Sequence, residues 1–418
     1  MRGQKMYCSG TSRPLSSSLF MRLGQLGLSI AAPVAVALFL VGCAASLDRN
    51  AVPLELADKV DVPAVGNVRH WGDEPLKDAE KLAKTRYEQI KALRPHLLAN
   101  QAPNFDLLAI SGGGADGAYG AGLLSGWTKR GDRPQFEIVA GVSTGALSAP
   151  FAFLGPQYDR QLTEIYTEYA TDDLITQQVL AGLIGGGSAV TSTKPLEALI
   201  KKYMNQQVLS EIAQEHKKGR RLLVGTTNLD SERPVVWDMG AIASQGTPQS
   251  GQLFRRILLA SAALPGLFPP VFLKVQSDGR TFQEMHVDGG TTDNAFLLPA
   301  GFDRSRHERK KARGGKHRIF IIANSKLAPD RQVVEATTFA IAGRSIATLI
   351  KQQLQGDLLK IYLRAKRNKI AFNLTSIPPS FQEKSSEPFD KAYMKKLYDV
   401  GFAIGVSGDG WSSEPSEF

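Results

Sequence analysis

The chain has 418 residues, of which 43% are hydrophobic and 22% charged, a composition typical of a globular protein rather than of a disordered or fibrous one. This length accommodates one large α/β domain or two smaller ones. The formal net charge of +10 is modest, and its first four positive charges, on Arg2, Lys5, Arg13 and Arg22, precede any acidic residue.

The N-terminus has the features of a bacterial secretion signal. Its basic residues are followed by an apolar stretch over about residues 26–41 and by Leu40-Val41-Gly42-Cys43, which resembles the lipobox cleaved before a cysteine. We therefore expect residues 1–42 to be a lipoprotein signal peptide and Cys43 to be the site of lipid attachment. The alternative is a retained single-pass anchor, although Pro33 interrupts the apolar run and its length is marginal for a spanning helix.

Signal cleavage would leave Cys43 as the only cysteine of the mature chain, because the other, Cys8, lies in the removed segment. No intramolecular disulfide could then form. Since Ala44 rather than aspartate follows the cysteine, we expect a lipid-anchored protein of the bacterial cell envelope, at the outer membrane if the cell is Gram-negative.

The rest of the chain divides into three parts. Residues 43–100 comprise a tether and an amphipathic helix over about 77–98, which Pro95 should end or kink. Residues 101–405 carry the motifs described below and are the expected catalytic domain. Residues 406–418, rich in Ser, Glu and Gly, are predicted to be a flexible tail.

Short apolar runs alternate with helical patterns through the central part. This alternation predicts an α/β fold in which helices cover both faces of a mostly parallel sheet. The expected strands are residues 105–110, 136–140, 221–226, 235–238, 271–275, 285–287, 319–323 and 370–374. The expected helices are residues 118–127, 146–153, 159–169, 195–204, 252–262, 333–355 and 391–404.

The sequence Gly141-Val142-Ser143-Thr144-Gly145 follows the second of these strands and leads into a helix. Gly-x-Ser-x-Gly at such a turn is the nucleophile elbow of serine hydrolases, where the glycines allow a sharp turn and close packing around the serine. Ser143 is therefore the candidate nucleophile, near the positive end of the following helix. The pattern alone is common, and its position after a strand makes it informative.

A glycine-rich sequence, Gly112-Gly113-Gly114-Ala115-Asp116-Gly117, follows the first strand. It satisfies the dinucleotide-binding fingerprint, but no acidic residue ends the second strand as that function requires. A Walker A loop would need Gly-Lys-Ser or Gly-Lys-Thr where Ala118-Tyr119 stands. A plain tight turn is a further interpretation. The favoured one is an oxyanion hole formed by Gly112, Gly113 and Gly114, whose unhindered amides would stabilise a developing negative charge.

A serine hydroxyl needs a partner that accepts its proton. Asp288, followed by Gly289-Gly290 at the end of a predicted strand, is the candidate base, although Asp-Gly-Gly is also an ordinary turn sequence. His286 lies on the same strand face as Asp288 if the strand is regular and should be tested by mutation. His307 and His317 flank a run rich in Arg, Lys and Gly that has the character of a solvated loop.

The three motifs, in this order, resemble those of the patatin-like phospholipases, in which they form a Ser–Asp dyad and an oxyanion loop. The segment Ala260–Val271 is also similar to the family's sequence upstream of the aspartate. The resemblance covers residues 105–294 well and the C-terminal part loosely. It implies a three-layer α/β/α sandwich of the patatin type, with Ser143 as nucleophile and Asp288 as proton acceptor. It also implies hydrolysis of a fatty acyl ester without a metal or other cofactor.

One residue departs from the family's pattern. Many members have Arg or Lys just before the last glycine of the first motif, and this chain has Asp116 before Gly117. If the basic side chain of those members holds an anionic head group, this site would favour neutral lipids or other esters.

The proposed base also has a chemical requirement. A free aspartate has a pKa of about 3.9, too low to accept a serine proton efficiently near neutrality. Enclosure by apolar groups would raise the pKa of Asp288. A bound acyl chain and the side chains of Phe268, Phe282 and Phe296 are the candidates for that enclosure.

Three functions fit these residues. The preferred one is a membrane-tethered lipid acyl hydrolase that acts on membrane lipid or a lipid ester and contacts the membrane surface through lipidated Cys43. A second is a Ser–Asp–His carboxylesterase of the α/β-hydrolase type, which would need His307 or His317. A third is a lipoprotein that binds lipid without turnover. Nucleic-acid binding is disfavoured, because no interleaved aromatic residues or recognised module accompany the basic run over residues 304–318.

Overall fold

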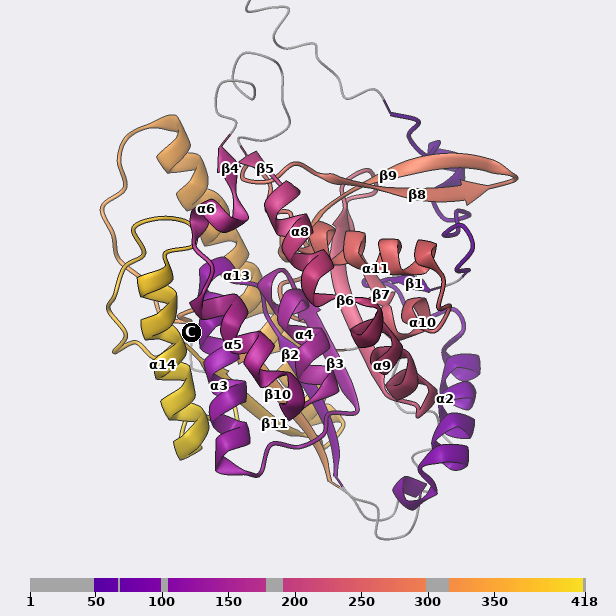
Figure 1. Cartoon of the computed structure of the whole chain (residues 1–418), viewed down its shortest axis with the longest axis horizontal. Helices are drawn as coiled ribbons and strands as arrows, with labels where there is room; N and C mark the ends of the chain where they lie inside the picture. The colour runs from indigo at the N-terminus through magenta and orange to yellow at the C-terminus, as the bar shows by residue number, and fades with distance from the viewer. Residues whose placement is uncertain (1–48, 67, 99–103, 178–190, 298–315, 416–418) are drawn as a thin grey trace, which may run out of the picture. The chain divides into compact units, whose positions relative to one another are not determined.

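The computed structural model describes residues 49–66, 68–98, 104–177, 191–297 and 316–415. Within these ranges the fold is built on a nine-stranded sheet in the order β1-β7-β6-β3-β2-β10-β11, with β9 paired to both β6 and β8 (Figure 1). Its strands are β1 Arg69–Trp71, β2 Phe105–Ile110, β3 Ile138–Val142, β6 Arg221–Asn228, β7 Arg233–Asp238, β8 Val271–Ser277, β9 Arg280–Asp288, β10 His317–Ala323 and β11 Ala371–Ser376. A separate pair consists of β4 Thr176–Gln177 and β5 Thr191–Ser192.

The described helices connect these strands. They are α2 Ala79–Leu93, α3 Gly117–Arg130, α4 Thr144–Leu154, α5 Asp159–Thr167, α6 Thr171–Leu174, α8 Lys194–Tyr203, α9 Gln206–Lys217, α10 Met239–Ala243, α11 Pro248–Ser261, α13 Thr338–Arg367 and α14 Lys391–Ser407. Short 3₁₀ turns lie at η1 Leu54–Leu56, η2 Pro95–Leu98, η3 Gly114–Asp116, η4 Pro156–Tyr158 and η5 Gly289–Thr291.

The centre of the sheet is parallel, as predicted. Each neighbouring pair in the series β6-β3-β2-β10-β11 runs in the same direction, whereas β1, β7, β8 and β9 add antiparallel pairs on one side. Because parallel strands are buried on both faces, they appear in the sequence as short, continuous apolar runs. The carboxyl ends of these strands therefore meet at one edge of the sheet.

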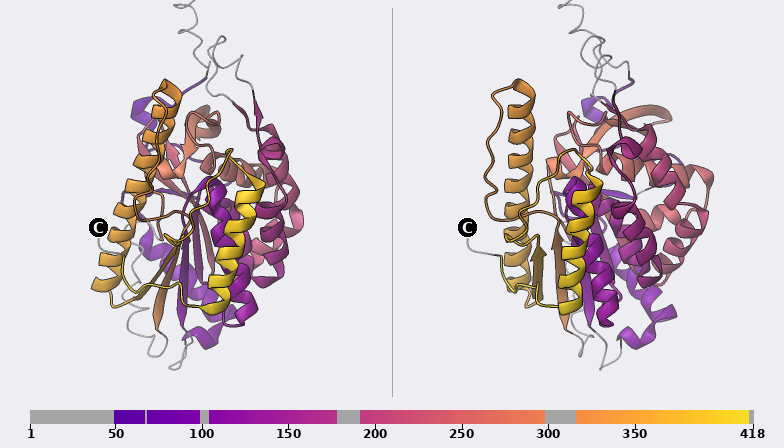
Figure 2. Two further views of the ribbon diagram at one scale, coloured as in Figure 1. Left: turned by 90° about the vertical axis from the view of Figure 1, so that its left-hand side faces the viewer. Right: turned by 60° about the vertical axis from the view of Figure 1, so that its left-hand side comes forward.

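Alternate residues of each strand contact different helical layers. Leu108 and Ile110 of β2 belong to the larger apolar core, which also contains residues of α3, α4 and α14. Leu107 and Ala109 instead face α13, where Leu354 and other residues pack on the sheet. Figure 2 shows α13, in orange, on the side of the sheet opposite to α14 and α3. This arrangement is the expected three-layer α/β/α sandwich.

Several boundaries differ from those expected. The strand predicted over 136–140 is β3 at residues 138–142, and the helix predicted over 333–355 is α13 at residues 338–367. The helix predicted over 77–98 ends at Leu93, and Pro95 opens the short turn η2. This ending follows from the missing amide of proline, which cannot continue the helical hydrogen bonds.

Two terminal predictions need correction within the described residues. We expected a tether, but from Arg49 onward the chain is docked: Asp61 pairs with Gln276 of β8, and Val60 packs with Val275. We also expected a flexible tail over 406–418. Residues 406–415 are instead held, because Ser412 exchanges two 2.8 Å backbone hydrogen bonds with Leu374 and Trp411 contacts the core aromatics. The expected signal peptide, Cys43, His307, most of the basic run and residues 416–418 lie outside the described residues.

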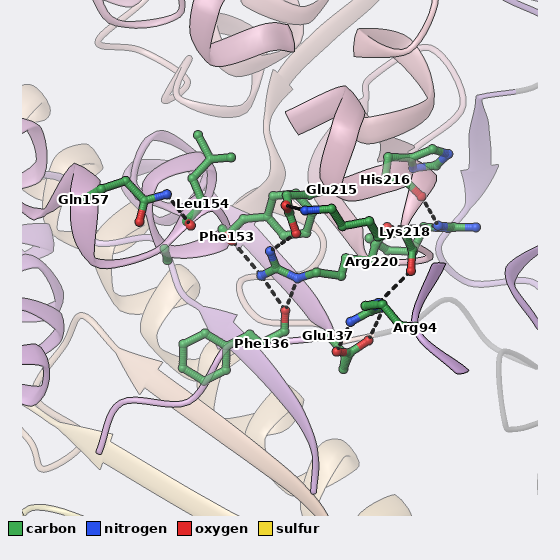
Figure 3. A network of polar contacts seen from close by, with 12 residues as sticks. Arg94, Phe136, Glu137, Phe153, Leu154, Gln157, Glu215, His216, Lys218 and Arg220 are labelled. Atoms are coloured by element: carbon green, nitrogen blue, oxygen red, sulfur yellow. Dashed lines mark hydrogen bonds and ion pairs between the residues drawn. The ribbon is translucent and has the colours of Figure 1, made fainter. Parts of the chain in front are cut away.

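A buried ionic network fastens the amino end of β3 (Figure 3). Glu137, which precedes β3, accepts two hydrogen bonds from Arg94 at 2.6 and 2.9 Å and pairs with Arg86 of α2 at 3.4 Å. Close by, the buried Arg220 donates to the carbonyls of Phe136 and Phe153 and to Glu215. Each of these arginine and glutamate side chains has a partner of opposite charge. The network therefore holds the start of β3, the strand that leads to Ser143.

Candidate active site

The ends of two strands meet beside β6. β3 pairs with β6 up to Val142 opposite Gly225, and β9 takes over at the next position, with Asp288 opposite Thr226. Ser143 follows the end of β3, and Asp288 is the last residue of β9. The two residues are 145 positions apart (288 − 143) in the sequence, and the sheet brings them together at its carboxyl edge.

Ser143 occupies a strained turn between β3 and α4. Its φ of 55° and ψ of −126° lie in a region that side-chain-bearing residues rarely adopt. The turn is held from outside, since the Ser143 amide donates to the Ser261 hydroxyl at 3.0 Å. That hydroxyl donates in turn to the carbonyl of Gly225 at 2.7 Å. The backbone therefore has the geometry of a nucleophile elbow, with the serine at the amino end of a helix.

Asp288 is buried, with 3% of its surface exposed. The pKa of its carboxyl is raised to about 6, because the effect of burial exceeds the opposing effects of the Ser143 side chain and the Gly290 amide. The bond from Gly290 measures 2.8 Å. The Ser143 side chain is thus close enough to affect the Asp288 carboxyl. A carboxyl with a pKa of about 6 is a better proton acceptor near neutrality than a free aspartate.

The proposed aromatic enclosure is only partly present. Phe296 lies against Gly225 next to the two strand ends, since a Cβ on Gly225 would lie 2.8 Å from its ring. Phe282 packs elsewhere, with Val60 and Val275 in a small separate cluster. The reason is its position six residues before Asp288, near the far end of the β8–β9 hairpin.

The glycine-rich loop runs directly beside Ser143. A Cβ on Gly112 would lie 2.9 Å from the Ser143 Cβ. The amides of Gly113 and Gly114 donate to no acceptor within the described part of the chain, as expected of oxyanion donors waiting for a substrate. Gly112 differs from the prediction, because its amide donates to Asn294 Oδ1 at 2.9 Å. We therefore remove Gly112 from the set of proposed donors.

The remaining motif glycines allow segments to approach closely. A Cβ on Gly117 would meet the Thr144 hydroxyl at 2.3 Å, and one on Gly145 would meet the Ile110 carbonyl at 2.2 Å. Gly141 and Gly289 have comparably close backbone neighbours, and a Cβ on Gly290 would lie 3.2 Å from the Asp288 carboxylate. The three motifs are thus packed into one another.

The two candidate histidines that the structure describes, His286 and His317, are occupied elsewhere. His286 is fully buried between the Thr226 hydroxyl, at 3.0 Å, and the Glu284 carboxylate, at 3.1 Å. His317 begins β10 and contacts the ring of Phe105, so it lies at the opposite edge of the sheet from Ser143. The strand register places them seven residues apart, about 23 Å at the rise of a strand. Neither is placed to complete a Ser–Asp–His triad.

Asp116, at the position where the family has a basic residue, is bound by a neighbouring helix. Its carboxylate accepts a 2.6 Å hydrogen bond from the hydroxyl of Tyr393 on α14. Burial raises its pKa to about 6, and the hydrogen bond and the charge of Lys326 oppose that rise. The first turn of the glycine-rich loop is thereby linked to the C-terminal helix.

Some residues that shape the site were not predicted. Asn294 holds the Gly112 amide, and its own amide donates to Asp357 at 2.8 Å. Asn324 accepts from the Gly120 amide and donates to the Ser111 carbonyl, which fixes the other side of the loop. The sequence carried one weak signal for Ser261, a polar residue that ends the apolar stretch Ile257–Ala260.

Residues 108–300 match the model of the family described as patatin-like phospholipase. This part of the chain is a patatin-like phospholipase domain. The family resemblance drawn from the three motifs is thereby confirmed, and the family supports a lipid hydrolase activity. None of the curated proteins matches the chain.

Solved structures give more distant similarities. VipD from Legionella pneumophila is 14% identical with a TM-score of 0.32, over 75% of this chain and 68% of its own. Human GIVD cytosolic phospholipase A2 is 11% identical with a TM-score of 0.34, over 81% and 66%. A chain of the ExoU–SpcU complex from Pseudomonas aeruginosa is 15% identical with a TM-score of 0.31, over 74% and 52%.

Proposed function

We propose that this chain hydrolyses carboxylic ester bonds of lipids with a Ser143–Asp288 dyad. The observation that carries the proposal is the meeting of two strand ends beside β6, where the strained Ser143 follows β3 and the buried Asp288 ends β9. Burial raises the pKa of Asp288 to about 6, and the Ser143 side chain is close enough to lower it. The family match at residues 108–300 supports a lipid as substrate. An elevated pKa and a serine on a strained turn are both features of catalytic sites rather than of ordinary turns.

In the proposed reaction, Ser143 Oγ attacks the ester carbonyl while its proton passes to Asp288. The carbonyl oxygen becomes negatively charged, and the amides of Gly113 and Gly114 stabilise it. Return of the proton to the leaving alcohol leaves an acyl group on Ser143. Water, deprotonated by Asp288, then releases the fatty acid and restores the serine.

Labelling with a fluorophosphonate, followed by a panel of lipid substrates, tests this proposal. We expect the wild type to react and Ser143→Ala to be unlabelled, with hydrolysis reduced by at least about 10⁴-fold. Asp288→Asn should lose hydrolysis while remaining folded. Labelling of Ser143→Ala, or unchanged turnover in Asp288→Asn, would contradict the assignment of these residues.

For the head group, we propose a preference for neutral lipids or uncharged esters. The support is the carboxylate of Asp116, held by Tyr393 beside the glycine-rich loop where other members carry a cation. Since a negative charge there would repel a phosphate, Asp116→Asn should improve hydrolysis of anionic phospholipids more than that of neutral esters. Equal changes for both substrates would show that Asp116 does not select the head group.

For the anchor, we propose that the chain is exported, cleaved before Cys43 and lipidated there. The support is the N-terminal sequence alone, with its basic start, apolar stretch and Leu-Val-Gly-Cys ending. Metabolic labelling with a fatty acid should mark the wild type and leave Cys43→Ser unlabelled. Fractionation should find the labelled protein in the membrane; equal labelling of both proteins would rule this site out.

A further inference from the structure

Among the residues whose burial the structure describes, the amino-terminal part of α13 has none of the buried side chains that anchor the rest of the helix. In the second half, Leu354, Leu358 and Ile361 are buried against the sheet at spacings of four and three residues. In the first half, Ile341 and Leu349 are 52% and 69% exposed. Figure 2 shows this half of α13 continuing beyond the ends of the strands.

This projecting half, residues 338–350, is largely apolar, since nine of its thirteen residues are apolar or glycine. Its thirteen residues contain one charged side chain, that of Arg344. Exposed residues follow one another around the helix, as at Ile341, Ala342 and Gly343, because each residue advances it by about 100°. Thr338, Ser345 and Thr348 are its other polar residues. Exposed apolar side chains such as Ile341 and Leu349 are favoured where apolar material covers them.

The junction between the two halves of α13 lies beside the candidate site. The Ile350 carbonyl accepts a hydrogen bond from Asn294 Nδ2 at 3.5 Å, and the Asp357 carboxylate accepts the Asn294 amide. Asn294 also holds the amide of Gly112, which lies against Ser143. The last residue of the apolar half therefore contacts Asn294, which holds the glycine-rich loop beside Ser143.

Basic residues lie within this segment and in the chain on either side of it. Residues 326–351 contain four basic and two acidic side chains, a net charge of 4 − 2 = +2. Arg344 and Lys351 donate to the carbonyls of Asp330 and Ala328, so they tie the preceding loop to the helix. Cations at the edge of an apolar surface attract anionic lipid head groups.

We infer that residues 338–350 insert into the surface of a lipid bilayer and thereby bring the candidate site to its substrate. The inference rests on the proposed function for its substrate class. At 1.5 Å per residue the segment is about 20 Å long, shorter than the roughly 30 Å apolar core of a bilayer. None of the described helices is long and apolar enough to cross a membrane. The segment would lie within one leaflet, as interfacial helices do.

Co-sedimentation with vesicles of phosphatidylcholine and phosphatidylglycerol tests the inference. The full chain should carry Cys43→Ser, so that no acyl chain on that residue contributes, and Ser143→Ala, so that lipid is not consumed. We expect Ile341→Asp and Leu349→Asp to weaken vesicle binding by at least about ten-fold. The matched control is Leu363→Asp, an equally polar change at a residue 56% exposed in the anchored half of the same helix. It should stay within about two-fold of the parent.

A second measurement places the segment in the bilayer. Leu349→Trp should show fluorescence quenched by brominated lipids, and Leu363→Trp should show much less quenching. Unchanged binding of Leu349→Asp would overturn the inference, as would equal losses at Leu363. A dimer that dissociates in Ile341→Asp would assign the surface to a second copy of the chain instead. With Ser143 intact, Leu349→Asp should still hydrolyse a dispersed short-chain ester, so a loss of vesicle binding is separable from failure of the proposed chemistry.

Discussion

The polar groups at the two ends of β3 differ in how fully they are paired. At the amino end, Glu137 is buried with two arginines, and its carboxylate oxygens are occupied by hydrogen bonds. At the carboxyl end, Ser143 is held at a positive φ, beside an aspartate whose burial favours the neutral form and beside loop amides with no acceptor in the described chain. The charged groups at the amino end of this five-residue strand are paired. The carboxyl end instead has a strained backbone, a buried carboxyl and amides without an acceptor.

The amino end of β3 therefore stabilises the fold, whereas the carboxyl end destabilises it. Strain and unpaired polar groups persist only where the surrounding structure over-determines them. The fastened amino end, the close contacts of the motif glycines and the Ser261 hydroxyl provide that constraint here. Substitutions at the amino end should therefore cost stability, while several substitutions at the carboxyl end should cost activity and increase stability.

The largest effect on stability is expected for Glu137→Gln. Removing the charge leaves Arg86 and Arg94 buried without a full counter-charge, which should cost about 3–5 kcal/mol of unfolding free energy. Chemical denaturation measures this, and the folded fraction should keep its kcat. The control is Glu74→Gln, which breaks an exposed pair with Arg233 and should cost less than about 1 kcal/mol. Similar losses for both variants would contradict the role given to the buried network.

Asp288→Asn should increase the free energy of unfolding at neutral pH. A carboxyl whose folded pKa is raised from 3.8 to about 6 favours folding most when protonated, so its contribution falls as pH rises through that interval. Asparagine removes the buried charge, and stability at pH 7 should rise by about 2–3 kcal/mol. The gain should disappear below about pH 4. An equal gain at both pH values would mean that ionisation of Asp288 is not its cause.

The same pKa predicts the pH profile of the wild-type enzyme. Because Asp288 must be ionised to accept a proton, kcat/KM should rise with pH and level off above about pH 6. A stopped assay with a lipid ester across this range measures the profile. A rate that is already constant from pH 4 upward would contradict Asp288 as the base.

A smaller effect is expected for Ser261→Ala. The Ser143 amide would lose its acceptor, which should cost about 1–3 kcal/mol of stability and let the elbow shift. We expect kcat to fall by about 10–100-fold with KM nearly unchanged, since small displacements of a nucleophile are costly. The matched control is Ser250→Ala, a buried serine of the same helix whose hydroxyl accepts the Thr247 amide in the capping box at the start of the helix. It should lose stability alone; an equal fall in kcat would deny Ser261 a positioning role.

The strands predicted correctly share a local signal. The parallel strands appear as short apolar runs, and the glycine-rich sequence and Ser143 follow two of them, β2 and β3, directly. Since parallel strands place their carboxyl ends at one edge, local patterns sufficed to bring Ser143 and the glycine-rich loop together. The family resemblance supplied the proposed role of Asp288, because an Asp-Gly-Gly sequence alone is an ordinary turn.

What could not be predicted depends on contacts distant in sequence. The bond from Gly112 to Asn294 spans 182 residues, and that from Ser143 to Ser261 spans 118. No periodicity reveals which amide a distant side chain will occupy. Composition misled at the C-terminus, where a stretch rich in Ser, Glu and Gly is held by Trp411 and a backbone pairing. One aromatic residue outweighed the composition of its neighbours.

The smallest effect tests the strain at the elbow itself. Ser143→Gly should increase stability by about 1 kcal/mol, because glycine adopts the φ of 55° without the clash of a Cβ. Ser143→Ala removes the same hydroxyl but keeps the Cβ, so it should show no such gain. Thermal unfolding of the two inactive variants isolates the backbone from the chemistry. If both variants melt at the same temperature, the turn is not strained, and the contrast between the two ends of β3 would reduce to Asp288 and the unpaired amides.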